Sequence, residues 1–158
     1  VRVIHGLIKR LNTGDAAAAP RVASVEADRT VPPPQPSQRT CLIVDDSRMI
    51  RKVARRIVES VGYAVVEAEN GEEGLARCRA AMPHLVITDW NMPVMSGIDF
   101  VTALRAIPTE RRPRVVFCTT NSGARDIHKG IEAGADEYVI KPFDDASLVS
   151  RLQAIGAA

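Results

Sequence analysis

The sequence is poor in aromatic residues and contains no long apolar run. Aromatic residues make up 4% of the chain, which argues against a surface that stacks single-stranded nucleic acid. No stretch approaches the roughly 18 apolar residues of a membrane-spanning helix, so we expect no membrane span. The N-terminus also lacks the apolar core and the small-residue cleavage site of a signal peptide.

Cysteine is equally scarce, and its three copies stand singly. Cys41, Cys78 and Cys118 lie in apolar surroundings and show neither a CxxC pair nor a metal-ligand spacing. We therefore predict reduced thiols in the core of a cytoplasmic protein. A redox or zinc site at these positions is disfavoured.

An excess of positive charge is missing from the part of the chain that should fold. The net charge is +2, with 21 basic and 19 acidic residues. Residues 1–40 hold six of the basic and three of the acidic ones, which leaves 15 and 16 for the rest. Because this remainder is nearly balanced, we predict no direct nucleic-acid partner.

Residues 1–40 are predicted to be a flexible N-terminal extension or linker. They are rich in Ala, Pro and polar residues, and residues 31–36 are typical of an extended, polyproline-like segment. Apolar residues within 1–11 follow helical spacing and fit a short amphipathic helix that docks on a partner or a membrane surface. We favour the plainer interpretation, the end of another domain or a helix that frays alone, partly because Gly6 interrupts the pattern.

Residues 41–158 form the predicted domain, in which five short apolar runs alternate with five amphipathic segments. The runs predict strands at 41–44, 64–66, 85–89, 115–118 and 138–140. The segments predict helices at 50–61, 70–78, 96–104, 122–133 and 148–155. Continuous apolar strands joined by helices indicate an α/β fold, a doubly wound parallel sheet covered on both faces.

Polar residues follow four of the five predicted strands. In an open parallel sheet the functional site lies beyond the carboxyl ends of the strands, so these side chains should meet at one edge. A solvated rim with an ordinary salt bridge is the alternative, and we disfavour it. The residues are Asp45, Asp46, Asp89, Thr119, Thr120 and Lys141.

Three neighbouring carboxylates need a cation, because two such charges about 4 Å apart repel by about 4 kcal/mol at an effective dielectric near 20. An all-oxygen ligand set with few protein groups suits Mg²⁺, and the absence of His and Cys ligands argues against zinc. A carboxylate beside Mg²⁺ and a lysine can act as a nucleophile toward a phosphoryl group.

These positions resemble the response-regulator receiver family. The resemblance covers residues 41–158 and is carried by Val44-Asp45-Asp46-Ser47, by Asp89-Trp90-Asn91-Met92-Pro93, by Thr119 and Tyr138, and by Lys141-Pro142-Phe143. It looks most like the single-domain, CheY-like subgroup, since no output domain follows. It implies a flavodoxin-like sheet with strand order 2-1-3-4-5 and a cis Lys141–Pro142 bond.

The resemblance also implies a role for each matching residue. Asp89 would accept the phosphoryl group, and Lys141 and Thr119 would contact it. Asp46, Asp89 and the backbone carbonyl of Asn91 would bind Mg²⁺, with Asp45 acting through water. Tyr138 would be the aromatic switch that turns when Thr119 moves; plain core packing is its alternative role.

The implied function is a phosphorylation switch in two-component signalling. A sensor histidine kinase or a histidine phosphotransfer protein would phosphorylate Asp89, since His5, His84 and His128 match no internal relay. The downstream protein, in chemotaxis for example, would bind the face formed by the fourth helix, fifth strand and fifth helix. Catalysis would be limited to self-catalysed phosphotransfer and slow self-dephosphorylation, so the chain would not be an enzyme in the usual sense.

Other functions stay open or are disfavoured. The chain could instead be a phosphate sink or phosphorelay intermediate, or the receiver fragment of a hybrid histidine kinase. A dehalogenase-type phosphatase needs Asp-x-Asp-x-Thr, which neither acidic motif supplies, and no P-loop or GxGxxG sequence is present. Thr120 departs from the small residue usual after the hydroxyl position, and we expect its branched side chain to slow dephosphorylation.

Overall fold

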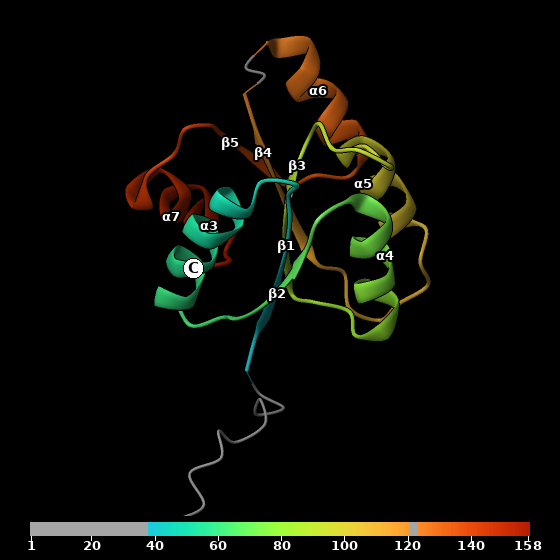
Figure 1. Ribbon diagram of the computed structural model, residues 1–158, viewed down its shortest axis with the longest axis horizontal. Helices are drawn as coiled ribbons and strands as arrows, with labels where there is room; N and C mark the ends of the chain where they lie inside the picture. The colour runs from blue at the N-terminus through green and yellow to red at the C-terminus, as the bar shows by residue number, and fades with distance from the viewer. Residues whose placement is uncertain (1–37, 121–122) are drawn as a thin grey trace, which may run out of the picture. The chain divides into compact units, whose positions relative to one another are not determined.

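The computed structural model describes residues 38–120 and 123–158. Five parallel strands form one sheet: β1 (Thr40–Val44), β2 (Ala64–Ala68), β3 (Leu85–Asp89), β4 (Arg114–Thr119) and β5 (Glu137–Ile140). Their order is β2-β1-β3-β4-β5, which confirms the predicted order (Figure 1). The predicted extension lies almost entirely outside the described residues, and its role stays a prediction.

In the described part of the chain four helices connect the strands and a fifth follows β5, and together they cover both faces of the sheet. They are α3 (Arg48–Ser60), α4 (Gly71–Ala80), α5 (Gly97–Arg105), α6 (Ala124–Ala133) and α7 (Asp145–Ala154). Figure 1 shows α3 and α7 on one face and α4, α5 and α6 on the other. None of the described helices is long and apolar enough to cross a bilayer.

The alternation of side chains along each strand divides the core into two layers. On β1, Cys41 and Ile43 pack into the layer under α3 and α7, whereas Leu42 and Val44 pack into the layer under α4 and α5. Both sets are almost fully buried. Because both faces of such a strand are buried, both need apolar side chains, and the strand is a continuous apolar run in the sequence.

The helix ends follow the expected capping chemistry. Ser47, Asn70 and Ser96 each accept a hydrogen bond from a backbone N–H in the first turn of the helix that follows. The reciprocal capping box occurs at Asp144 and Ser147, at the start of α7. At Ser96 the serine hydroxyl accepts the backbone N–H of Asp99.

Several boundaries differ from the prediction. β2 continues to Ala68 and includes Glu67, because an edge strand needs only one apolar face. β4 and β5 each begin one residue early, and α6 begins at Ala124 rather than at residue 122. The three cysteines are buried free thiols, as predicted, and burial raises the pKa of Cys78 to about 11.

Candidate functional site

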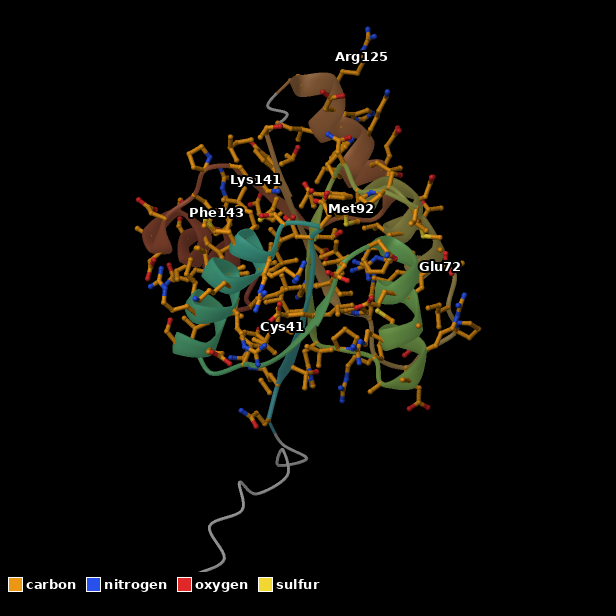
Figure 2. The ribbon with its side chains drawn as sticks, viewed as in Figure 1. Cys41, Glu72, Met92, Arg125, Lys141 and Phe143 are labelled. Carbon is orange, nitrogen blue, oxygen red and sulfur yellow. The ribbon has the colours of Figure 1, made fainter. Side chains whose placement is uncertain are left out.

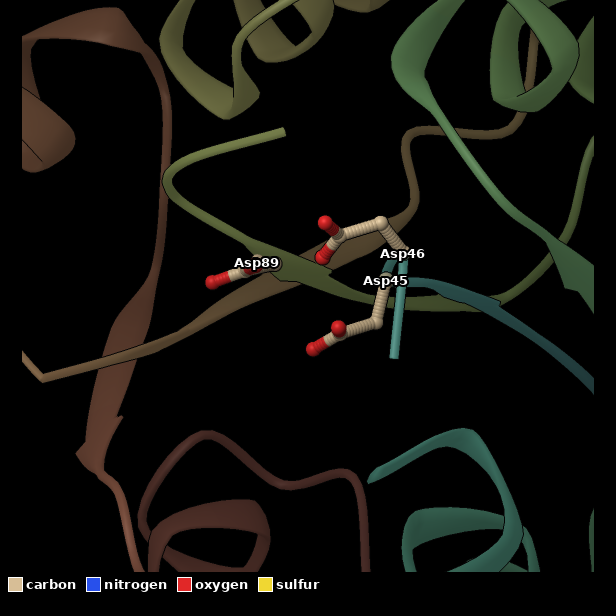
Figure 3. A group of neighbouring side chains, drawn as sticks. All are labelled: Asp45, Asp46 and Asp89. Carbon is tan, nitrogen blue, oxygen red and sulfur yellow. The ribbon is translucent and has the colours of Figure 1, made fainter. Parts of the chain in front are cut away.

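Three carboxylates from two adjacent strands meet at the carboxyl edge of the sheet. β1 and β3 pair with Val44 opposite Thr88, so the residues that follow, Asp45 and Asp89, are neighbours across the ladder. One carboxylate oxygen from each of Asp45, Asp46 and Asp89 lies within 4.8 Å of the other two (Figure 3). The acidic group expected from the strand ends is therefore present.

Asp45 is the buried member of this group, with 2% of its surface exposed. One of its carboxylate oxygens accepts the backbone N–H of Ser47 at 2.8 Å, and the other accepts a hydrogen bond from Lys141 Nζ at 2.9 Å. Asp46, the next residue, is exposed. The two carboxylates thus differ in character: Asp45 is held by protein donors, and Asp46 faces solvent.

Lys141 reaches the same edge from the end of β5. Its ammonium lies 2.9 Å from Asp45 and 3.1 Å from Asp89. Burial alone would lower the pKa of Lys141, but the hydrogen bonds and charges of the two aspartates outweigh it, and the net shift is upward. The lysine is therefore a charged group fixed between two carboxylates.

The environment of Asp89 disfavours its negative charge. Burial raises the pKa of Asp89, and the nearby charge of Asp45 raises it further. Lys141 and the backbone N–H of Trp90, which donates to Asp89 Oδ1 at 2.8 Å, offset only part of this. A cation placed among the three carboxylates would reduce their mutual repulsion, so the site is electrostatically suited to binding a cation.

Thr119 ends β4, Lys141 follows the neighbouring strand β5, and a backbone hydrogen bond joins the two residues. Thr119 is 2% exposed, and its carbonyl accepts the backbone N–H of Lys141 at 2.8 Å. The Lys141–Pro142 bond is cis, as predicted. Thr120, in contrast, is exposed.

Tyr138 lies on β5 and Asn91 in the loop after β3, and the switch and metal-binding roles expected for them stay predictions. Tyr138 pairs in register with Phe117, is half-buried, and has the guanidinium of Arg151 4.8 Å from its ring centroid. Asn91 is exposed and follows Asp89 by two residues. Trp90 is half-buried beside Phe117, with ring centroids 4.9 Å apart.

Sequence reasoning missed one residue that supports the site. Arg51 on α3 is buried and donates from Nη1 to the carbonyl of Asp45 at 2.6 Å and from Nε to Glu67 at 2.9 Å. It thereby fixes the backbone of the acidic pair. Its spacing, three and seven residues before the buried Ala54 and Val58, was the available signal.

The fold and this edge define a receiver-type domain, and comparison with known proteins agrees. A family model for the response regulator receiver domain matches residues 41–153. The chain belongs to this family. Chemotaxis protein CheY1 of Helicobacter pylori is 34% identical over 116 residues, covering 72% of this chain and 94% of that protein.

Two further relatives show the range of similar proteins. The phosphate regulon transcriptional regulatory protein PhoB of Escherichia coli is 34% identical over 117 residues, or 74% of this chain, which spans about half (51%) of PhoB. The solved structure of chemotaxis response regulator CheY4 of Vibrio cholerae has a TM-score of 0.71 and 33% identity, covering 75% of this chain and 99% of that one.

Proposed function

We propose that this receiver domain is a phosphorylation switch in which Asp89 accepts a phosphoryl group from the phosphohistidine of a sensor histidine kinase or a histidine phosphotransfer protein. The observation that carries the proposal is the contact of Lys141 with both Asp45 and Asp89 at the edge where the three carboxylates meet. Membership of the receiver family supports it.

The side chains present fit Mg²⁺. Three carboxylates and one ammonium leave two negative charges in excess, and all the side-chain donors of the acidic group are hard oxygen atoms. Asp46, Asp89 and the backbone carbonyl of Asn91 would hold the ion, and Asp45 would act through water. When bound, Mg²⁺ neutralises charge on the oxygens of the transferring phosphoryl group.

The transfer requires one bond to form and one to break. A carboxylate oxygen of Asp89 attacks phosphorus, and the phosphorus–nitrogen bond of the phosphohistidine breaks with its electron pair passing to the imidazole. The ammonium of Lys141, 3.1 Å from Asp89, compensates the charge of the phosphoryl oxygens. In self-dephosphorylation a water oxygen attacks phosphorus, and the carboxylate of Asp89 leaves.

The response to phosphorylation is proposed to reach the face formed by α6, β5 and α7. The Thr119 hydroxyl would turn to the phosphoryl group, and the Tyr138 ring would occupy the space that Thr119 leaves. The packing of α6 supports this: of its residues only Gly130 is buried, and a Cβ there would lie 3.0–3.1 Å from Trp90 and Phe117. A helix with so small a buried surface has low local stability.

A downstream protein that binds this face would read the switch, in chemotaxis for example. Moving a two-state equilibrium from 1:99 to 99:1 takes about 5.5 kcal/mol of differential binding energy. The buried free thiols favour a reducing compartment, so we place the protein in the cytoplasm. Its own catalysis would be confined to self-phosphorylation and self-dephosphorylation.

A phosphate sink or relay, or the receiver of a hybrid kinase, is the second candidate. It is favoured by the likeness to the signal receiver domain of a histidine kinase from Syntrophus aciditrophicus, which is 32% identical with a TM-score of 0.65. The discriminating measurement is whether the phosphorylated chain binds a protein other than a kinase. A relay would only pass the phosphoryl group to another histidine.

The proposal is tested by phosphotransfer from purified, autophosphorylated sensor kinases of the source organism to the full chain. Intact mass should show one phosphoryl group on the wild type and none on Asp89→Asn. Asp99→Asn, which changes an exposed aspartate on α5, is the matched control and should behave as wild type. Equal phosphorylation of wild type and Asp89→Asn would contradict the proposal.

A further inference from the structure

The loop between Asp89 and α5 contains a tight turn centred on Val94. The backbone N–H of Met95 donates to the carbonyl of Pro93 at 2.7 Å, and Val94 between them has φ 71°. A three-residue turn with this bond and a positive φ is a rare, strained form of γ-turn. Among the described residues the other positive φ values belong to glycines, whereas Val94 is β-branched.

Packing on both sides holds this turn in place. A Cβ at Gly71, the first residue of α4, would lie 3.0 Å from the side chain and the carbonyl of Met95. A Cβ at Gly97 would clash with the carbonyl of Asp89, and the Gly97 N–H donates to the carbonyl of Trp90 at 2.8 Å. The strain persists because the surroundings fix the loop at both ends.

Val94 is also one of the most exposed large apolar side chains of the described chain, at 73%. It is therefore unfavourable both in its backbone and in its contact with water, and it adds nothing to either core layer. Strain combined with apolar exposure is a reason to look for a function in binding.

The surface beside Val94 is hollowed and acidic. A shallow hollow of about 390 Å³ is lined by Val94 and by Asn70, Glu72, Glu73 and Ala76 of the start of α4. Figure 2 labels Glu72, which lines this hollow from α4. The exposed Val94 side chain next to two carboxylates complements a partner surface that combines an apolar recess with lysine or arginine.

We propose that Val94 and this acidic hollow are a contact by which the protein that donates the phosphoryl group is selected. The inference rests on the proposed function. The loop begins at Asp89 itself, and a phosphohistidine must come within bonding distance of that residue, so its carrier protein lies over this rim. A small phosphodonor needs no such contact.

The experiment compares two phosphodonors on full-length variants. One donor is the autophosphorylated sensor kinase that transfers fastest to the wild type, and the other is acetyl phosphate. Val94→Thr keeps the shape and the β-branch but replaces one methyl group by a hydroxyl, Val94→Gly removes the side chain altogether, and Glu72→Lys reverses the charge. Val66→Thr, on the edge strand β2 with Val66 39% exposed, is the matched control.

We expect Val94→Thr, Val94→Gly and Glu72→Lys each to slow transfer from the kinase about fivefold to tenfold, the effect of losing a good interface contact. Their rates with acetyl phosphate should equal that of the wild type, and Val66→Thr should be normal with both donors. Val94→Gly should also melt at a higher temperature than Val94→Thr, because it relieves the strain of the turn.

Each other result decides between the claims. Unchanged kinase rates in the Val94 variants overturn the inference and leave the proposed function standing. An equal loss with both donors means that the loop acts on Asp89 directly, which also overturns it. If the wild type accepts a phosphoryl group from acetyl phosphate but from no kinase, a kinase is excluded as the partner and the inference fails. If the wild type accepts a phosphoryl group from neither donor, the proposed function itself is refuted.

Discussion

Magnesium should stabilise the fold well beyond any effect of ionic strength. Asp45, Asp46 and Asp89 place carboxylate oxygens within 4.8 Å of one another. Two unit charges at that separation repel by about 3.5 kcal/mol at an effective dielectric near 20. Lys141 offsets part of the repulsion through Asp45 and Asp89, but the group keeps two negative charges in excess. Folding holds these charges together, and a divalent cation relieves the cost.

The size of the effect follows from linkage. Free Mg²⁺ at about 100 times its dissociation constant stabilises the state that binds it by about 2.7 kcal/mol. For a domain of this size, 1 kcal/mol shifts the melting temperature by about 4 °C, so the expected rise is about 10 °C. Chelation of the metal should reverse it fully.

Thermal unfolding followed by circular dichroism, at constant ionic strength set with Na⁺, measures this shift. Asp46→Ala should abolish most of the rise, because it removes the exposed ligand and leaves the buried Asp45–Lys141 pair intact. Asp99→Ala, an exposed aspartate away from the site, should keep the full rise. If Na⁺ and Mg²⁺ act equally, or if Asp46→Ala retains the rise, the assignment of these carboxylates to a metal is refuted.

Three further predictions concern Lys141, His84 and Thr120. Lys141→Met should destabilise the metal-free protein by about 3 kcal/mol in urea unfolding, because it leaves Asp45, 2% exposed, without its ammonium partner. The control variant Arg125→Met, which changes an exposed arginine, should lose less stability. Burial and the charges of Arg111 and Arg39 lower the pKa of His84, whose Nδ1 accepts the N–H of Thr40 at 3.1 Å. Its contribution to stability should be complete above pH about 6.5 and be lost as the pH falls through the lower folded pKa, and His84→Gln should flatten that part of the stability profile. Thr120→Ala should shorten the lifetime of the phosphorylated protein, and a lifetime that is equal or longer would count against the shielding role of Thr120.

The central strands and the acidic edge could be predicted because local pattern determines them. A strand covered on both faces reads as a short apolar run, and β1, β3 and β4 do so without interruption up to the polar residues that end them. Parallel pairing then requires that Asp45 and Asp89 meet. The order of the strands came from the family resemblance.

Contacts that depend on long-range geometry could not be predicted in the same way. β2 includes Glu67, whose charge suggests the end of a strand, yet Arg51 and Arg55 of α3 bind it at 2.9 and 2.6 Å. The γ-turn at Val94 contradicts the preference of a β-branched residue, and the packing of Gly71 against Met95 and of Gly97 against Asp89 holds it in place. Neither feature leaves a periodic signal in the sequence.

The two ends of the sheet differ in how their polar groups are satisfied, and this difference supports the proposed location of the switch at the carboxyl end. At the amino end, Arg105 donates to the carbonyls of Gly134 and Pro113 and pairs with Asp136, which in turn accepts the N–H of Val115. At the carboxyl end, burial and then the nearby charge of Asp45 raise the pKa of Asp89. A new charge at the first end would break hydrogen bonds that are already made, whereas a metal ion and a phosphoryl group at the second would balance charges that folding leaves uncompensated. Conformational response to phosphorylation is therefore expected from the carboxyl end, while the amino end anchors the strands.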